Sequence, residues 1–398
     1  MSAIKYWLWL SAAAVSAKSR AALLDRYGEP EKAFFAPPGE LSAVDGVSPR
    51  DAATLEKREI KNTDWIAAAC VRQGIRIVTM QDAEYPQRLR HIFSPPPVIY
   101  VKGELPIVDD EAAIAVVGTR RASSYGLKMG RQLASDIVAS GGIVISGLTS
   151  GVDAAAARGA ILSKECGRCI GVLGTSHEHE RGALAAEVAL RGALISEYPP
   201  GTKTEKYFFR DRNRITAGLA AGVVVVEAPE RSGTLLFAAT AMEQGKEVFA
   251  VPGNADSPNS VGTNALIKNG AKTAVCGWDV LSEFEPRFPG KLHRAEGKVP
   301  QEEPEAEKPD VSAKKSVDNK KDSDYIDLKE LLEGLNEDQR SIVEAIGGSV
   351  LHIDDIIAAT GLSTARVLSQ LTVLEIRGVV RRDSARRMAL NTVKSAKK

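Results

Sequence analysis

The stretch KYFFRDRNRITAGLAAGVVVVEA, residues 206–228, decides the fold class of this 398-residue chain. Its unbroken run of four valines, residues 223–226, is typical of a strand that is buried on both faces, as in a parallel sheet. Four cations come just ahead of this strand: Lys206, Arg210, Arg212 and Arg214. Because the strand itself is buried, these cations are expected at one rim of the sheet, where an anionic ligand docks.

Apolar runs of the same kind recur from residue 112 onward, and helical patterns separate most of them. The runs are AAIAVVG, GIVISGL, CIGVLG, ALISEY, VVVVEA, EVFAVPG and TAVC. Alternating strands and helices predict an α/β fold with an extended, Rossmann-like, doubly wound and mostly parallel sheet. No G-x-G-x-x-G follows the first run and no Walker A lysine motif occurs in the sequence, so the common dinucleotide and triphosphate fingerprints are absent.

Three further regions flank the predicted Rossmann-like domain, which we place at residues 81–287. Residues 1–80 alternate short helical patterns with turn signals and predict a small helical domain of the SAM or helix-hairpin kind. Residues 288–327 are charged and proline-bearing, which predicts a disordered linker. Residues 328–398 hold three helical patterns and a basic hairpin, and thus predict a winged helix-turn-helix.

Composition favours a cytoplasmic protein that has no membrane anchor. The net charge is only +1, so a nucleic-acid surface has to be a local patch. Four cysteines are too few for a disulfide scaffold in a chain of this length, which fits a reducing compartment. The segment YWLWLSAAAVSA imitates a signal peptide, but Ser11 interrupts its apolar run and an amphipathic helical pattern continues to Gly28.

Two loops after predicted strands have the composition of phosphate-binding turns. SGLTSGVDAAAARGA, residues 146–160, places small residues between a strand and a helix, and ERSGTLLFAA, residues 230–239, repeats the arrangement. Backbone amides at such helix starts bind phosphate without lysine. Arg120 and Arg121 follow the first strand at the same predicted rim, so the sequence predicts an anion-binding groove there.

Aromatic residues lie among the cations of the opening stretch: Tyr207, Phe208 and Phe209. Cations interleaved with aromatic rings suit single-stranded nucleic acid, because charges follow the phosphates and rings stack on unpaired bases. The alternative is that Phe208 or Phe209 belongs to the core and that some arginines pair with Asp211, Glu205 or Glu227. We expect at least one arginine to be structural.

The motif CGRC, residues 166–169, invites a redox interpretation, and with His177 and His179 a zinc interpretation. The intervening IGVLG is a predicted strand of about 17 Å, which keeps the cysteines and histidines apart. We therefore predict no metal and no cofactor.

Six ordered motifs identify a family. VVGTRRASSYG, ISGLTSGVDAAAARGA, LISEYPPGT, FRDRNRITAGLAAGVVVVEA, SGTLLFAATAMEQGKEVFAVPG and SVGTNALIKNGA together closely resemble the DNA-processing protein A family, also called DprA or Smf. The resemblance covers nearly the whole chain. It implies a non-enzymatic recombination mediator that binds and protects incoming single-stranded DNA, assists loading of the RecA recombinase in natural transformation, and forms a homodimer.

The resemblance also assigns residues. The family's pocket arginine falls on Arg120 in the GTR motif that starts at Gly118, its lysine on Lys206 and its base-contacting aromatic on Phe209. Further DNA contacts are implied for the RNR element and for two loops that supply backbone donors: Arg212, Asn213, Arg214, Ser146, Gly147, Ser232, Gly233 and Thr234. The implied self-association surface comprises Asn264, Leu266, Ile267 and Lys268.

The sequence departs from the family pattern at two places. Ala157 stands where the family usually has His, and TSHEHE, with His177 and His179, replaces a Tyr-Pro pair in the loop after GVLG. Two other functions stay open. A phosphoribohydrolase-like nucleotide-processing enzyme needs a carboxylate near the Gly-Thr loop, for which Glu230 is the candidate. A duplex-binding regulator would use the winged helix, which alternatively contacts a protein.

Overall fold

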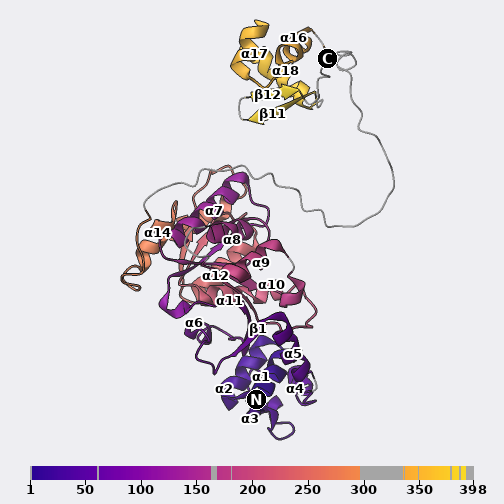
Figure 1. Cartoon of the computed structure of the whole chain (residues 1–398), viewed down its shortest axis with the longest axis vertical. Helices are drawn as coiled ribbons and strands as arrows, with labels where there is room; N and C mark the ends of the chain where they lie inside the picture. The colour runs from indigo at the N-terminus through magenta and orange to yellow at the C-terminus, as the bar shows by residue number, and fades with distance from the viewer. Residues whose placement is uncertain are drawn as a thin grey trace, which may run out of the picture. The chain divides into compact units, whose positions relative to one another are not determined.

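The computed structural model describes residues 2–60, 62–162, 168–180, 182–295, 335, 337–347, 349–376, 379–384 and 387–390. It divides the chain into two compact units, Met1–Pro300 and Gln301–Lys398 (Figure 1). Most of the predicted linker, residues 296–327, lies outside the described residues, so the linker remains a prediction.

The larger unit is built on a nine-stranded sheet in the order β1-β2-β6-β5-β4-β3-β7-β8-β9. Neighbouring strands from β6 to β9 in this order are parallel, whereas β2 pairs antiparallel with both β1 and β6. The mostly parallel sheet predicted from the sequence is thereby confirmed. The strands are β1 (Ile75–Thr79), β2 (Val98–Gly103), β3 (Ala113–Val117), β4 (Ile143–Ser146), β5 (Cys169–Leu173), β6 (Ala193–Ser196), β7 (Gly222–Val225), β8 (Glu247–Ala250) and β9 (Lys272–Thr273).

The direction of winding reverses between β3 and β7. The chain builds β4, β5 and β6 on one side of β3, then returns to place β7, β8 and β9 on its other side. In open α/β sheets, ligands bind beside the carboxyl ends of the strands at such a switch point. The topology alone therefore directs attention to the loops that follow β3 and β7.

Helices cover both faces of this sheet. Alternate residues of β3 supply the two cores: Ile114 and Val116 face one set of helices, and Ala113, Ala115 and Val117 face the other. The first core contains side chains of α7 (Ser124–Ala139), α8 (Val152–Leu162), α9 (Ala183–Arg191) and α14 (Gly277–Leu281). The second contains side chains of α6 (Gln87–Arg90), α11 (Asn213–Leu219), α12 (Gly233–Glu243) and α13 (Val261–Lys268). Burial on both faces explains the continuous apolar strands.

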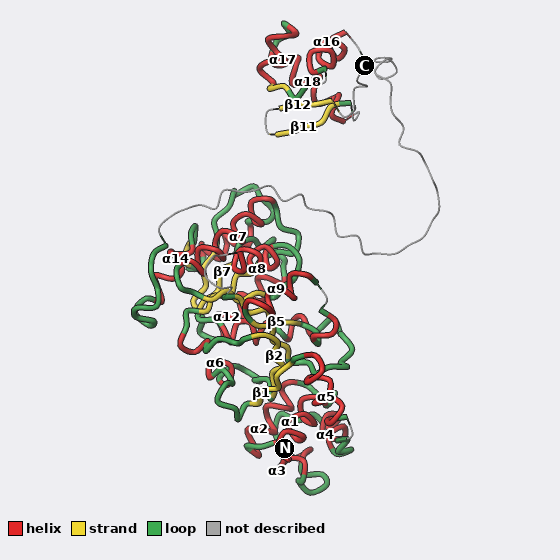
Figure 2. The backbone as a smooth tube through the Cα atoms, viewed as in Figure 1, coloured by secondary structure: helices red, strands yellow, loops and turns green. Residues whose placement is uncertain are grey.

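The N-terminal helices are α1 (Ser2–Ala12), α2 (Ala17–Tyr27), α3 (Pro30–Phe34), α4 (Pro49–Leu55) and α5 (Thr63–Gln73), and they lie beside β1 (Figure 2). The apolar side chains of α1 form one core with Val98 and Tyr100 of β2. Buried Ser11 lies 3.2 Å from the Tyr100 hydroxyl, within hydrogen-bond distance. Residues 6–12 of the segment that imitates a signal peptide thus belong to a helix that packs into the protein. Among the described residues, no helix is both long and apolar enough to cross a bilayer.

Strand β1 belongs to the sheet, while its Ile75 packs with the N-terminal helices. The boundary at residue 80 between the helical domain and the Rossmann-like domain therefore remains a prediction. Glycine allows a positive φ at two helix ends: α2 ends at Gly28, as the sequence predicts, and α5 ends at Gly74.

The smaller unit is a winged helix. Its three helices, α16 (Glu337–Ile346), α17 (Ile353–Thr360) and α18 (Thr364–Ile376), surround one apolar core. Gly361 follows α17 in a left-handed conformation and ends this helix. The wing is a three-stranded sheet of β10 (Leu351–His352), β12 (Arg387–Leu390) and β11 (Val380–Ser384), in that order.

Candidate nucleic-acid interface

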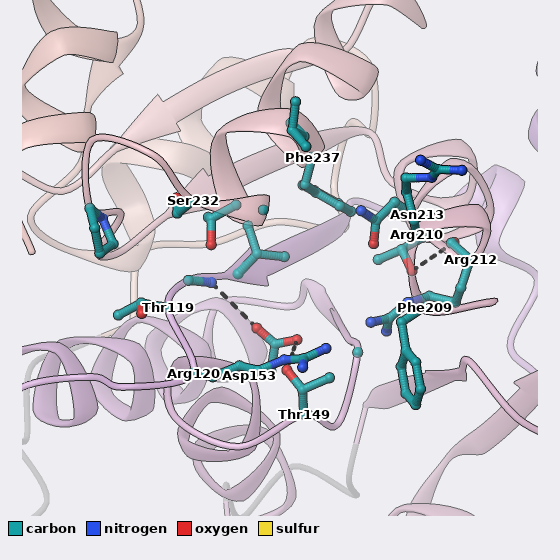
Figure 3. Close-up of a pocket in the computed structure, with 18 of the residues that line it drawn as sticks. Thr119, Arg120, Thr149, Asp153, Phe209, Arg210, Arg212, Asn213, Ser232 and Phe237 are labelled. Carbon is teal, nitrogen blue, oxygen red and sulfur yellow. Dashed lines mark hydrogen bonds between the residues drawn. The ribbon is translucent and has the colours of Figure 1, made fainter. Parts of the chain in front are cut away.

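A pocket of about 600 Å³ opens at the carboxyl ends of β3 and β7 (Figure 3). It lies at the switch point of the sheet, and loops after three strands line it, together with the segment that precedes α11. The pocket brings together all the predicted DNA contacts except Ser146 and Arg214: Gly118, Arg120, Gly147, Lys206, Phe209, Arg212, Asn213, Ser232, Gly233 and Thr234.

The mouth of the pocket is cationic. Arg120, Lys206 and Arg210 are exposed; Arg120 follows β3, whereas Lys206 and Arg210 belong to the segment that precedes α11. Arg121 and Arg231 are exposed on the same lining. This patch of positive charge stands out in a chain whose net charge is only +1, as required of a local anion-binding surface.

The two adjacent phenylalanines have separate roles. Phe208 is buried and stacks on Tyr198, with ring centroids 3.8 Å apart. Phe209 is half-buried at the pocket wall, and the Arg120 guanidinium lies 5.6 Å from its ring centroid. Gly174 allows this arrangement, since a Cβ there would lie 2.7 Å from the Phe209 ring. Phe208 is therefore the core residue that the alternative interpretation required, while Phe209 is available for stacking.

The amino end of α12 forms another side of the pocket. Ser232 stands at the N-cap position, but its side chain makes no capping hydrogen bond. Within the described residues, its buried Oγ atom has no hydrogen-bond partner. Gly233 and Thr234, the first residues of the helix, also line the pocket. Unpaired amides and the helix dipole at such an end favour a phosphate group.

Asp153 and Arg212 support the pocket from beneath. Asp153 is 6% exposed and accepts hydrogen bonds from the Gly118 amide at 3.3 Å and from the Thr149 hydroxyl at 2.9 Å. Burial raises the pKa of Asp153, and neighbouring Arg212 opposes this effect. Arg212 is 5% exposed and donates to the Val172 carbonyl at 2.8 Å. It is thus a wall residue held by internal contacts.

Gly147 is needed because these two side chains approach the backbone closely. A Cβ at Gly147 would lie 2.1 Å from an Arg212 nitrogen and 2.6 Å from an Asp153 oxygen. Ser146, immediately before it, is fully buried and donates to the Asp153 carbonyl at 2.8 Å. Ser146 therefore shapes the loop without lining the pocket.

Arg214 points to a different partner. It donates two hydrogen bonds of 2.6 Å to buried Glu197, and Arg20 of α2 lies 3.7 Å from the same carboxylate. This confirms that one arginine of the opening stretch is structural. Its partner, Glu197, was not among the carboxylates predicted to pair with these arginines.

Glu227 is a supporting residue that the sequence did not single out for this role. It is 1% exposed, and its carboxylate accepts hydrogen bonds from the Ser123 amide and hydroxyl at the start of α7. Its carbonyl accepts from the Thr119 amide at 2.9 Å. Gly126 leaves room for it, since a Cβ there would lie 2.2 Å from the carboxylate. Its signal in the sequence is an acidic residue directly after a four-valine strand.

Two residues that depart from the family pattern, Ala157 and His177, are buried, whereas His179 is exposed. Ala157 is fully buried in the core between α8 and the sheet. His177 is 7% exposed, with its Nε2 atom 2.8 Å from the Tyr100 carbonyl oxygen, and burial lowers the pKa of His177 to about 4. In the part of the chain that the structure describes, no group of His, Cys, Asp and Glu side chains could hold a metal ion.

The redox interpretation finds little chemical support. Cys169 is a buried free thiol, and burial raises its pKa to about 12, which suppresses the reactive thiolate. Its predicted partner, Cys166, lies outside the described residues.

The four predicted self-association residues all belong to α13. Asn264 forms two hydrogen bonds with the Gly253 backbone, at 3.2 and 3.0 Å. Leu266 packs partly against the sheet core, while Lys268 is exposed and Ile267 half-buried. Lys268 is thus the most accessible of the four residues.

Comparisons with known proteins agree with the geometry. Residues 76–285 match the family model of DNA recombination-mediator protein A, and residues 328–385 match that of the DprA winged helix domain. Protein Smf of Synechocystis sp. is 30% identical over 96% of this chain and 97% of its own length. DNA processing protein DprA of Bacillus subtilis is 38% identical over 56% of this chain and 75% of its own.

A solved structure supports the same assignment. The X-ray structure of DprA from Streptococcus pneumoniae matches with a TM-score of 0.58 and 31% identity, and it covers 70% of this chain and 96% of that one. The first family model spans more than half of the chain, and one relative spans nearly all of it. The chain therefore belongs to the DNA recombination-mediator protein A family, also known as DprA or Smf.

Proposed function

We propose that this protein binds single-stranded DNA in the pocket between the ends of β3 and β7. The observation that carries the proposal is that Arg120, Lys206 and half-buried Phe209 line one pocket, beside the amino end of α12. Cations and helix amides hold the phosphates, and the ring stacks on a base that has no partner strand. A paired base would not offer its face in this way, so unpaired DNA fits better than duplex.

The pocket favours binding over catalysis. Among the residues that the structure describes, its lining contains one carboxylate, Asp153, and that group is buried and hydrogen-bonded to the Gly118 amide and Thr149. Glu230, the residue that a nucleotide hydrolase would use, is exposed and is not part of the lining. A general base must reach the reacting proton, and neither side chain is placed to do so. We therefore propose a non-enzymatic recombination mediator that uses no cofactor.

Further partners follow from family membership. We propose that the protein protects incoming DNA and assists loading of a RecA recombinase during natural transformation in the cytoplasm. The proposed homodimer surface is on α13, with exposed Lys268 and half-buried Ile267, and the winged helix is the proposed contact for duplex DNA or a protein.

The decisive test is the Arg120→Ala variant. Binding of fluorescent oligo-dT is measured by anisotropy at several salt concentrations, with Arg131→Ala, an exposed arginine of α7 outside the pocket, as control. We expect weaker binding only for Arg120→Ala, with a log–log salt slope that is smaller by about 0.7 for each lost phosphate contact. Unchanged affinity would contradict the proposal. Parallel titrations with duplex and free nucleotides separate it from the regulator and hydrolase alternatives.

A further inference from the structure

A second, smaller pocket adjoins the first. It has a volume of about 230 Å³, room for a single base, and shares Arg120, Gly147, Thr149 and Phe209 with the larger pocket. Its other walls come from the loop after β4 and the loop after β5: Leu148, Ser150, Leu173, Gly174, Thr175 and Glu180. The two pockets are thus neighbours that meet at Phe209 and Arg120.

The backbone of this second pocket is held in an unusual conformation. Leu148 has a φ of 52°, in the left-handed region that side chains other than glycine avoid. Its side chain occupies the space over Gly171, where a Cβ would lie 2.5 Å from it. Its amide donates to the Ser146 hydroxyl at 3.1 Å. Such strain persists only where the surroundings enforce it, and it tends to occur at ligand sites.

The charges of the two pockets differ. The larger pocket carries several exposed cations at its mouth, whereas the described residues that line the smaller one include one cation, Arg120, and one carboxylate, Glu180. Glu180 is half-exposed, and one of its oxygens accepts from the Gly182 amide at 3.3 Å, within its own loop. A carboxylate repels phosphate, so this pocket suits an uncharged base better than a backbone group. Arg120, which lines both pockets, is placed to hold the phosphate between two successive nucleotides.

Glu180 also restricts which base fits. A carboxylate only accepts hydrogen bonds. Guanine presents two adjacent donors, N1–H and the N2 amino group, which match the two carboxylate oxygens. Adenine and cytosine present one amino group beside an acceptor nitrogen, and thymine presents one N–H between two carbonyl oxygens. Bases of a single strand are read on these edges.

We propose that the smaller pocket is a base-reading subsite in which Glu180 selects guanine in single-stranded DNA. This inference rests on the proposed function, because the base arrives as part of a strand held in the larger pocket. Phe209 lies between the subsites and stacks on the bound base, and Glu180 pairs with its Watson–Crick edge. The loop that carries Glu180 is the TSHEHE segment, in which this chain departs from its family.

The test measures anisotropy competition between oligo-dT and oligo-dT strands that carry a single guanine at successive positions. A single guanine avoids guanine-rich secondary structure. For the unaltered full chain, we expect strands with guanine at one of these positions to bind at least about fivefold tighter than oligo-dT. This factor is the lower end of the base discrimination that a bidentate pair of hydrogen bonds provides. In Glu180→Gln the preference should fall below about twofold, because an amide matches the N–H and carbonyl of thymine as well as those of guanine.

Two further variants complete the test. Glu180→Ala removes the acceptor altogether and should also abolish the preference. Glu187→Gln, which removes an exposed carboxylate of α9 outside both pockets, should retain it, and thermal melting verifies that all variants fold.

The results distinguish failure of the guanine subsite, of the role of Glu180 and of single-strand binding itself. Equal binding of guanine and thymine strands by the unaltered chain, with Arg120→Ala still impaired, overturns the guanine subsite and leaves single-strand binding intact. A guanine preference that persists in both Glu180 variants overturns the role of Glu180. Absence of single-strand binding by the unaltered chain overturns the proposed function itself.

Discussion

Phe208 and Phe209 provide a matched pair of substitutions at the scale of single residues. Phe209→Ala should weaken oligo-dT binding by about 1–3 kcal/mol, the usual effect of losing one stacked base, with a smaller effect on stability because the ring is half-buried. Phe208→Ala removes a buried ring from its stack on Tyr198 and should lower the free energy of unfolding by about 3–5 kcal/mol. Anisotropy and denaturant titrations measure the two effects. Loss of stability without loss of binding in Phe209→Ala would make that ring a core residue.

His177 should make stability depend on pH. Burial lowers the pKa of His177 to about 4, whereas a histidine in the unfolded chain has a pKa of about 6.5. Acidification therefore protonates the unfolded chain first, and the free energy of unfolding should fall between about pH 6.5 and pH 4, by about 2 kcal/mol at pH 5. His177→Asn should flatten this part of the profile, while His179→Asn, at an exposed site, should not. Identical profiles for the unaltered chain and His177→Asn would contradict the assignment.

The sequence located the charged residues but not their burial. It placed Arg120, Lys206 and Phe209 at one rim, and the structure brings them to one pocket. It could not separate Arg210, which is exposed, from Arg212 and Arg214, which are held by internal partners. The partner carboxylates, Asp153 and Glu197, come from other loops, and only the folded sheet brings them together with the arginines.

At the scale of elements, Glu197 joins three segments. This carboxylate follows β6, binds Arg214 of α11 and lies near Arg20 of α2. Glu197→Gln would leave Arg214, whose side chain is 11% exposed, without its counter-charge, and we expect a loss of about 3–5 kcal/mol in the free energy of unfolding. Glu283→Gln, which breaks the exposed pair with Lys272, should cost less than about 1 kcal/mol. Denaturant titration measures the free energy of unfolding of both variants. Equal and small losses would mean that water screens the ion pair between Arg214 and Glu197.

Strand identity was easier to predict than strand pairing. The alternation of apolar runs and helices predicted the parallel strands, because burial on both faces leaves an unmistakable pattern. Three consecutive prolines, residues 95–97, directly precede β2, yet β2 pairs antiparallel with β1 and β6. Pairing between distant segments depends on tertiary contacts, which local patterns do not encode.

At the scale of the whole molecule, the two compact units should be separable. Deletion of residues 301–398 removes the winged helix and leaves the complete pocket, whose lining lies between Val117 and Phe237. We expect the affinity for oligo-dT to stay within about threefold of that of the full chain. This is a smaller change than the tenfold change in affinity that corresponds to about 1.4 kcal/mol of binding free energy. A larger loss would mean that the winged helix contributes to single-strand binding.

The sharing of β1 and β2 between helices and sheet has a practical consequence for trimmed versions of the protein. A fragment that starts at residue 81 would lack β1, and the hydrogen-bonding side of β2 that β1 covers would become an open sheet edge. Tyr100 and Val98, which now pack with the N-terminal helices, would face water. Open apolar edges recruit strands from other molecules, so such a fragment should aggregate at concentrations at which the intact chain stays dispersed.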